Sequence, residues 1–226
     1  MSYTIESIAE CIGARRVGEC EATIDWLLTD SRSLSFPEET LFFALTTKRN
    51  SGARYIPDLY DRGVRNFVVT EEDFEKFKNG ELGKLSTLNF LIVANPLKAL
   101  QKLAEIHREE FKIPIIGITG SNGKTIVKEW LHQLLSPDRR IVRSPRSYNS
   151  QIGVPLSVWQ LNEEAELGIF EAGISEMGEM NALKRMIKPT IGILTNIGGA
   201  HQENFFSLQE KCMELSLIHI SEPTRP

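Results

Sequence analysis

A glycine-rich loop between a strand and a helix constrains the fold of this chain more than any other feature. The apolar run IPIIGI at 113–118 is typical of a buried strand, and TGSNGKT and a helical pattern at 125–135 follow it. Gly120 and Gly123 allow the backbone to turn so that successive N–H groups converge on phosphate oxygens. The helix start adds its partial positive charge at the same point. This order therefore predicts a nucleotide site on an open α/β sheet.

Side chains of the loop supply the chemistry that phosphate binding needs. We expect the Lys124 ammonium to reach the β- and γ-phosphates and the Thr125 hydroxyl to ligate Mg²⁺. The loop is a variant of the strict pattern G-x-x-x-x-G-K-[ST], because Ile118 stands where that pattern has glycine. A glycine-rich turn with a surface lysine is the alternative, and the strand–loop–helix context disfavours it. The loop residues predicted to bind the nucleotide are Gly120, Ser121, Asn122, Gly123, Lys124 and Thr125.

Polar residues also follow two later apolar runs, at the edge where an open parallel sheet binds its ligands. Glu171 follows LGIF, where a carboxylate is placed for Mg²⁺, although a helix cap or a solvated side chain would give the same pattern. Asn196 and His201 follow IGIL. Asn196 could hydrogen-bond an adenine edge or cap a turn. His201 could be a second metal ligand, a phosphate contact or a structural residue.

The remaining apolar patterns predict an α/β protein of two domains. Residues 4–12 form a helical pattern that Thr4 can cap and Gly13 can end. A helix at 96–111 is the expected connector between a small N-terminal α/β domain (1–110) and a P-loop-type domain (111–214) with a mostly parallel, doubly wound sheet. The expected strands lie at 41–45, 67–69, 90–93, 113–118, 140–142, 167–170 and 191–194.

Several other side chains are predicted to be structural, and for a basic cluster two interpretations stay open. His107 and His132 lie on helical patterns and are predicted to be structural, and Glu179 is read as a helix-start residue. The side chains predicted to form the buried stripe of the helix at 125–135 are Ile126, Val127, Trp130, Leu131 and Leu134. The basic cluster that could hold an anionic substrate or form a solvated face is Arg139, Arg140, Arg143 and Arg146.

Composition argues against several classes of protein. The chain is 41% hydrophobic and 25% charged, which is ordinary for a globular protein. Its net charge of −4 provides no global basic field, so we expect no nucleic-acid partner, and any anionic ligand must be held by a local site. No apolar run is long enough to span a bilayer and the start lacks a leader pattern, so no membrane insertion is expected. An odd count of three cysteines favours a reduced, cytoplasmic compartment.

Four motifs, TGSNGKT, YNSQIGVPLSV, FEAGISEMGEM and TNIGGAHQENF, together resemble the Mur ligases of peptidoglycan synthesis. The upstream segments DSR and LFFAL resemble the uridine-nucleotide-binding domain of that family. Within the family, the motifs are most similar to those of the enzyme whose substrates are UDP-N-acetylmuramoyl-tripeptide and D-Ala-D-Ala. The resemblance implies a ligase that uses ATP and Mg²⁺, and we expect a monomer. ATP phosphorylates the tripeptide carboxylate, and the dipeptide amine attacks the resulting acyl phosphate.

The resemblance also implies roles for individual residues. The catalytic set would be Lys124, Glu171 and His201, and the metal ligands would be Thr125, Glu171 and His201. Asn196 would join the loop in binding the nucleotide, and Asn149 would face the muramoyl-peptide end. Ser31 and Arg32 would contact the uridine diphosphate. Residues 46–54 depart from the pattern of the family, which leaves substrate contacts there undefined. Another Mur ligase, a folylpolyglutamate synthase-like ligase and a non-catalytic UDP-sugar-peptide-binding module stay open as alternatives.

Residues 215–226, LSLIHISEPTRP, match nothing in the family and continue no clear element. They can be back-translated to a transposase-end adaptor of sequencing libraries, so we expect a non-native tail and an incomplete central domain. Family members have a carbamate-modified lysine at the position where this chain has Leu215. We therefore expect the 226-residue chain to lack ligase activity that its full-length parent has.

Overall fold

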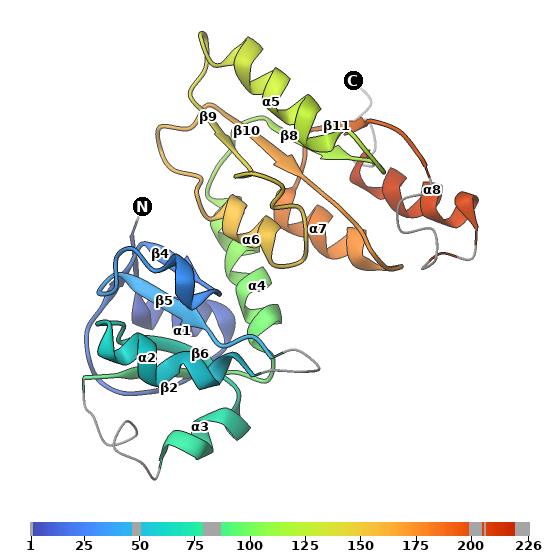
Figure 1. Ribbon diagram of the computed structural model, residues 1–226. Coiled ribbons are helices and arrows are strands. Elements are labelled where there is room, and N and C mark those ends of the chain that lie inside the picture. The colour runs from blue at the N-terminus through green and yellow to red at the C-terminus, as the bar shows by residue number, and fades with distance from the viewer. Residues whose placement is uncertain (1, 47–50, 79–86, 199–204, 206, 220–226) are drawn as a thin grey trace. The chain divides into compact units, whose positions relative to one another are not determined.

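The computed structural model describes residues 2–46, 51–78, 87–198, 205 and 207–219. The chain forms two compact units, Met1–Leu103 and Ala104–Pro226. The division falls inside helix α4 (Pro96–Glu109), the predicted connector, a few residues before the boundary expected at 110. Both units are α/β, which confirms the predicted fold class (Figure 1). In the described part of the chain, no helix is long and apolar enough to cross a membrane.

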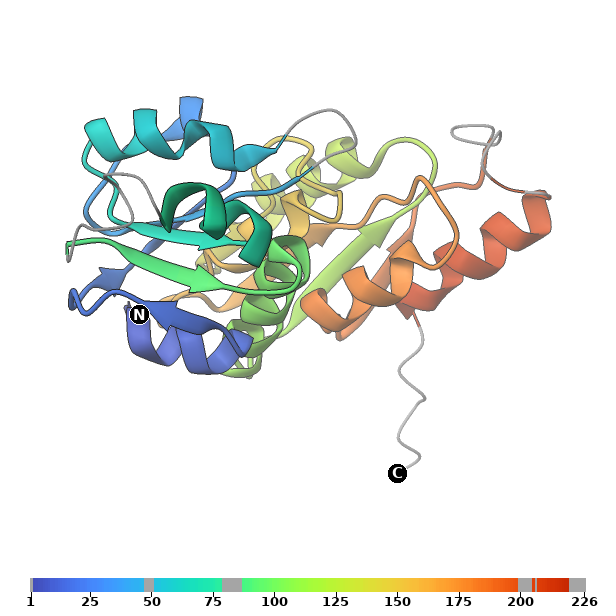
Figure 2. The same ribbon diagram turned by 90° about the horizontal axis from the view of Figure 1, so that it is seen from below.

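The first unit is built around a mixed five-stranded sheet with the strand order β2-β7-β6-β5-β4. Phe42, Phe67 and Phe90 lie on neighbouring strands and pack with residues of α2 and α3, while α1 lies on the other side of the sheet (Figure 2). Only β2 is antiparallel to its neighbour. The strands are β2 (Arg15–Val17), β4 (Trp26–Leu28), β5 (Thr40–Phe43), β6 (Asn66–Val69) and β7 (Asn89–Ile92), with a separate pair β1 (Tyr3–Thr4) and β3 (Thr23–Ile24). The helices are α1 (Ile5–Ile12), α2 (Ile56–Asp61) and α3 (Glu71–Lys78), with 3₁₀ helices η1 (Ser31–Ser33) and η2 (Gly52–Tyr55).

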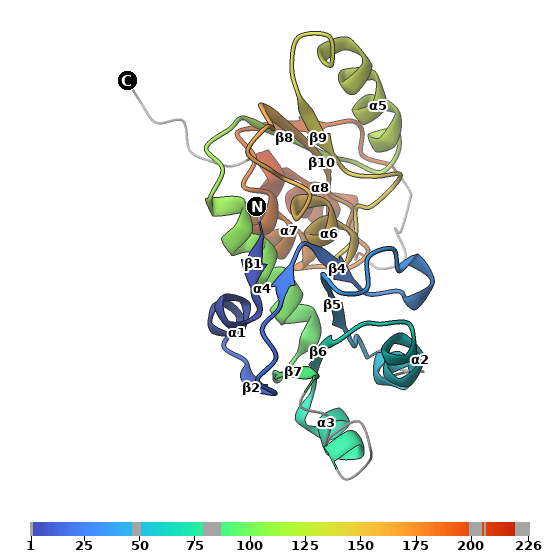
Figure 3. The same cartoon turned by 90° about the vertical axis from the view of Figure 1, so that its left-hand side faces the viewer.

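The second unit has the predicted parallel sheet, with the strand order β11-β8-β10-β9. Ile116 and Ile118 face α5, whereas Ile115 and Phe170 face α6, α7 and the chain end, so helices cover both faces (Figure 3). The strands are β8 (Ile115–Thr119), β9 (Ile141–Arg143), β10 (Leu167–Glu171) and β11 (Ile191–Leu194). The helices are α5 (Lys124–Leu135), α6 (Gly153–Val158), α7 (Glu179–Ile187) and α8 (Leu208–Ser216), followed by the 3₁₀ helix η5 (Leu217–His219).

The buried stripe of α5 differs from the predicted one. Val127 and Leu131 pack against the sheet as predicted, together with Leu135. Ile126, Trp130 and Leu134 are 57%, 62% and 72% exposed, so the prediction was wrong for these three side chains. The two sets lie on adjacent stripes, because each repeats every four residues and they are offset by one position, about 100° around the helix. The sheet covers only one of these stripes.

Residues 215–219 are part of the fold, which corrects the prediction that the chain end continues no element. Helix α8 extends to Ser216, and η5 follows it. Leu215 and Ile218 are buried in the core of the second unit because their three-residue spacing puts them on one side of a helical turn. Residues 220–226 lie outside the described part of the chain. The adaptor origin of residues 215–226 stays a prediction.

His107 of α4 is a structural residue, as its position on the helix predicted. Its side chain is 2% exposed, with the ring centroid 4.6 Å from that of Trp159 and 5.0 Å from that of Phe111. The ring Nε2–H donates to the carbonyl of Leu161 (3.0 Å). Burial lowers the pKa of His107 from 6.5 to about 4, although the hydrogen bond to Leu161 opposes this shift.

We expect His107 to make the fold sensitive to acid. Between pH 6.5 and about 4 the unfolded chain binds a proton at this ring that the folded chain does not, so the free energy of unfolding falls as the pH decreases. The loss should reach about 3 kcal/mol. Urea unfolding at two pH values should show a smaller acid loss for His107→Leu than for the unsubstituted chain. His132→Leu, at a partly exposed ring, is the control. Equal acid losses in the unsubstituted chain and His107→Leu would contradict this assignment.

Candidate functional site

The glycine-rich loop follows β8 and is anchored to the end of β11. The backbone N–H of Ser121 donates to the carbonyl of Asn196 (2.9 Å), and the N–H of Asn122 donates to Oδ1 of Asn196 (2.9 Å). Asn196 therefore caps the loop, which is one of the two roles that its position after β11 predicted. The Ser121 hydroxyl donates to the carbonyl of Gly198 (3.1 Å) and accepts from its N–H (2.8 Å). These contacts fix the loop across two strand ends.

Gly120 is the position in this loop that tolerates no side chain. Its φ of +136° is one that residues with a Cβ rarely adopt. A Cβ built there would lie 2.1 Å from Oγ1 of Thr195, which itself donates to the carbonyl of Asn122. The close approach of the loop to β11 therefore requires glycine at this position.

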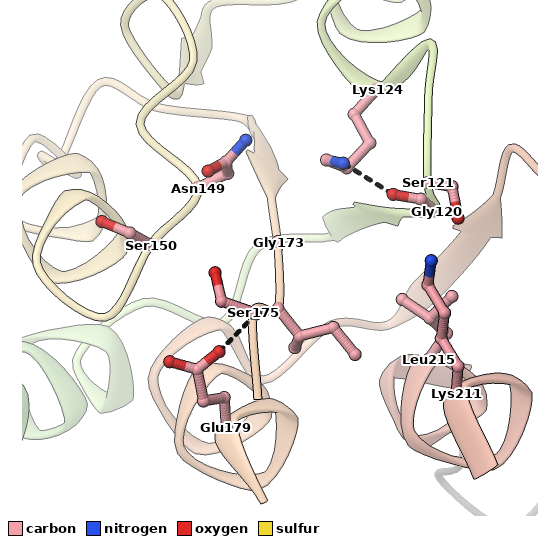
Figure 4. A pocket seen from close by; sticks show the side chains of 11 residues that line it. Gly120, Ser121, Lys124, Asn149, Ser150, Gly173, Ser175, Glu179, Lys211 and Leu215 are labelled. Carbon is pink, nitrogen blue, oxygen red and sulfur yellow. Dashed lines mark hydrogen bonds between the residues drawn. The ribbon is translucent and has the colours of Figure 1, made fainter. Parts of the chain in front are cut away.

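Lys124 begins α5 and lines a pocket with a volume of about 110 Å³ (Figure 4). Its Nζ donates to the carbonyl of Gly120 (2.6 Å), so the ammonium is folded back over the loop. Burial lowers the pKa of Lys124; the nearby charge of Glu171 opposes this shift, and the nearby charge of Lys211 adds to it. The pocket thus has a desolvated lysine at its loop side. It is also lined by Asn149, Gly173, Ser175 and Lys211.

Thr125 and Glu171 meet at the ends of α5 and β10, as the sequence predicted. The Thr125 hydroxyl donates to Oε2 of Glu171 (3.1 Å), and the Glu171 side chain is fully buried. Oε1 lies 2.9 Å from the ammonium of Lys128, yet no described group gives it a hydrogen bond of good geometry. A hydroxyl beside a buried carboxylate is a donor set that Mg²⁺ accepts, and P-loop proteins complete it with phosphate and water.

The second expected metal ligand, His201, lies outside the described residues. Within the described residues, no three His, Cys, Asp or Glu side chains cluster as metal ligands. The fit to Mg²⁺ therefore rests on Thr125 and Glu171 alone.

Asn149 is brought into the same pocket from the loop after β9. Its carbonyl accepts from the N–H of Gly173 (2.8 Å), two residues after Glu171. Gly173 leaves room for it, because a Cβ there would lie 3.0 Å from Cγ of Asn149. The pocket thus combines the phosphate loop with a residue expected at the substrate end.

Ser31 and Arg32 form a separate group in the first unit. Both lie on η1, next to Thr29, Asp30 and Tyr55 in a surface pocket. Arg32 is exposed and pairs with Asp30 (2.6 Å). This hydrogen-bonded pairing raises the pKa of Arg32 and lowers the pKa of Asp30.

Two lysines near the loop were not predicted from the sequence. Lys128 follows Lys124 by one helical turn, a spacing that puts both on one side of α5 and that could have identified it. Lys211 of α8 is buried and donates to the carbonyl of Gly198 (2.6 Å). No local sequence pattern identifies Lys211, because it is distant in sequence from the loop and only the fold brings it to the pocket. Glu179 is the first residue of α7, as predicted, and its carboxylate accepts from the N–H groups of Ser175 and Glu176 in the preceding loop.

Comparisons with known proteins match both units. The Mur ligase middle domain profile matches residues 118–217. The UDP-N-acetylmuramoyl-tripeptide–D-alanyl-D-alanine ligase of Borreliella burgdorferi is 36% identical over 203 residues, covering 88% of this chain and 43% of the relative. MurF from Acinetobacter baumannii shares the fold, with a TM-score of 0.82 at 24% identity over 98% of this chain and 47% of that one. MurF from Thermotoga maritima, solved in complex with ADP, has a TM-score of 0.71 at 25% identity, and the match covers 85% of this chain and 42% of that one.

The chain spans less than half the length of these relatives. Its mixed sheet and its parallel sheet match the N-terminal and middle domains of MurF. The chain belongs to the Mur ligase family and is MurF-like over these two domains.

Proposed function

We propose that the full-length protein joins D-Ala-D-Ala to UDP-N-acetylmuramoyl-tripeptide in an ATP-dependent reaction in the cytoplasm. The observation that supports this most is the pocket that the loop, Lys124 and Asn149 line together, with Thr125, the residue after Lys124, hydrogen-bonded to Glu171. The names of the relatives supply the substrates. A carboxylate oxygen of the tripeptide attacks the γ-phosphorus and ADP leaves. The dipeptide amine then attacks the acyl carbon, phosphate leaves and an amide forms.

Each group of site residues has a defined task in this reaction. The N–H groups at the start of α5 and the Lys124 ammonium bind phosphate oxygens, and the ammonium exchanges its contact with the Gly120 carbonyl for them. Thr125 and Glu171 would hold Mg²⁺, which neutralises charge on the transferred phosphoryl group. Asn149, fixed through its backbone by Gly173, orients the muramoyl-peptide end. Ser31 and Arg32 of the first unit would bind the uridine diphosphate.

The ligase proposal is tested on the full-length protein. We expect phosphate release from ATP only when UDP-N-acetylmuramoyl-tripeptide and D-Ala-D-Ala are both present, because the acyl phosphate needs the first and its breakdown needs the second. D-Ala alone is the matched control, since it has one residue fewer and the same amine. A full-length protein that accepts single amino acids and refuses the dipeptide would contradict the substrate assignment.

The nucleotide site is tested on the 226-residue chain. We expect Lys124→Met to weaken Mg·ATP binding, measured by calorimetry, roughly 10- to 100-fold, because one charge-assisted hydrogen bond to phosphate is lost. Lys112→Met, at an exposed lysine outside the pocket, is the control and should bind like the unsubstituted chain. No saturable binding of Mg·ATP to the unsubstituted chain would refute the site.

We also expect Gly120→Ala to abolish saturable ATP binding and to lower Tm, because the new Cβ would collide with Thr195 and displace the loop. Gly178→Ala is the matched control: its φ of +85° imposes backbone strain, but no atom lies within 4 Å of the new Cβ. This control should lose some stability and keep its ATP affinity. Retained ATP affinity in Gly120→Ala would show that the loop does not need its present path.

A further inference from the structure

Lys128 is a fully buried lysine, and neither the fold nor the proposed reaction has given it a task. It lies one turn after Lys124 on α5, beside side chains that pack against the sheet. Its Nζ donates to the carbonyls of Ser144 (2.8 Å) and Arg146 and lies 2.9 Å from Oε1 of Glu171. It also lies 3.2 Å from Oε1 of Glu129, the next residue on its own helix. The ammonium therefore joins α5 to two other segments, the loop after β9 and the end of β10.

A buried ammonium contributes less to the stability of the fold than an apolar side chain would if it only packs against its neighbours. Removing a charge from water carries a large penalty, and an apolar side chain of similar volume often serves stability as well or better. Methionine would fit the same length of chain without that penalty. The contacts of Lys128 therefore indicate a requirement other than stability.

The ion pair divides the two oxygens of Glu171 between two partners. Oε1 is held by Lys128, and Oε2 accepts from the Thr125 hydroxyl. The backbone N–H of Glu171 donates to the hydroxyl of Ser144 (3.1 Å). The backbone carbonyl of the same Ser144 accepts from Lys128. Both the carboxylate and the backbone of Glu171 are thus tied to the lysine, which leaves Oε2 as the oxygen beside the phosphate loop.

The same ammonium fixes the loop that carries Asn149. Arg146 has a φ of +49°, a left-handed conformation that costs a side-chain-bearing residue free energy, and its carbonyl accepts from Lys128. Three residues later, the Asn149 carbonyl accepts from Gly173. Lys128 therefore sets the direction in which this loop leaves β9 toward the pocket.

We propose that Lys128 is a positioning residue that orients Glu171 toward the Thr125 side and holds the Ser144–Asn149 loop against it. This inference rests on the proposed Mg·ATP site. It assigns Lys128 no contact with nucleotide or substrate, because its Nζ is enclosed by protein oxygens. Its effect on ligand binding should pass through Glu171.

The test measures ATP affinity of the 226-residue chain by calorimetry, with Mg²⁺ and with excess EDTA, for four proteins. These are the unsubstituted chain, Lys128→Met, Glu171→Gln and the double variant. We expect Lys128→Met to reduce the Mg²⁺-dependent gain in affinity about tenfold and to change Mg²⁺-free affinity less than about twofold. In the Glu171→Gln background, Lys128→Met should change neither affinity by more than about twofold. Lys112→Met is the charge-matched surface control.

Each outcome decides the proposal. An unchanged Mg²⁺-dependent gain in Lys128→Met would overturn it, and so would an equal loss in the Glu171→Gln background, since that loss would be structural. If Lys128→Met does not fold, Glu171→Gln and the double variant still decide, because neither leaves the Glu171 charge buried without its partner. A further loss in the double variant overturns the proposal, and equal binding supports it. Absent ATP binding by the unsubstituted chain would instead count against the proposed function.

Discussion

The parallel pairing of β8 with β10 and β11 is the constraint on which the site depends. Parallel strands end at the same edge of a sheet, and the register places Glu171 opposite Ile118 and Leu194 opposite Thr119. The Glu171 carboxylate, the phosphate loop and the segment at Asn196 therefore lie at the same edge of the sheet. A slip of one residue would turn the Glu171 side chain to the other face of the sheet, away from Thr125. The site is thus a consequence of strand register before it is a property of any single side chain.

The phosphate loop needs a second segment to hold its shape. Its N–H groups at Ser121 and Asn122 donate to Asn196, and Gly120 can approach Thr195 only because it has no Cβ. Helix α5 then begins at Lys124 with its N-terminal N–H groups directed toward the loop. Because Thr195 and Asn196 directly follow β11, the loop conformation is coupled to the sheet and not set by local sequence alone.

Local patterns predicted the elements well, and partners distant in sequence decided the rest. Thr4 and Gly13 bounded α1, and the strand–loop–helix order gave the site, because capping and glycine conformation act over a few residues. The buried stripe of α5 was missed at Trp130, because two adjacent apolar stripes fit a helix equally well and only the sheet selects one. The roles of Asn196 and Lys128 depend on residues more than fifteen positions away, which no local pattern contains.

A negative net charge and an anion site are compatible because the two act over different distances. The chain has a net charge of −4, but surface charges are screened within about 8 Å at physiological ionic strength. Lys124 and Lys211 line the pocket, where burial limits that screening, and the loop N–H groups add partial positive charge. Lys128 adds no field of this kind, since the carboxylates of Glu171 and Glu129 lie 2.9 Å and 3.2 Å from its ammonium. A phosphate entering the pocket therefore meets the ammonium groups of Lys124 and Lys211, and attraction for the nucleotide comes from these two lysines and from the start of α5.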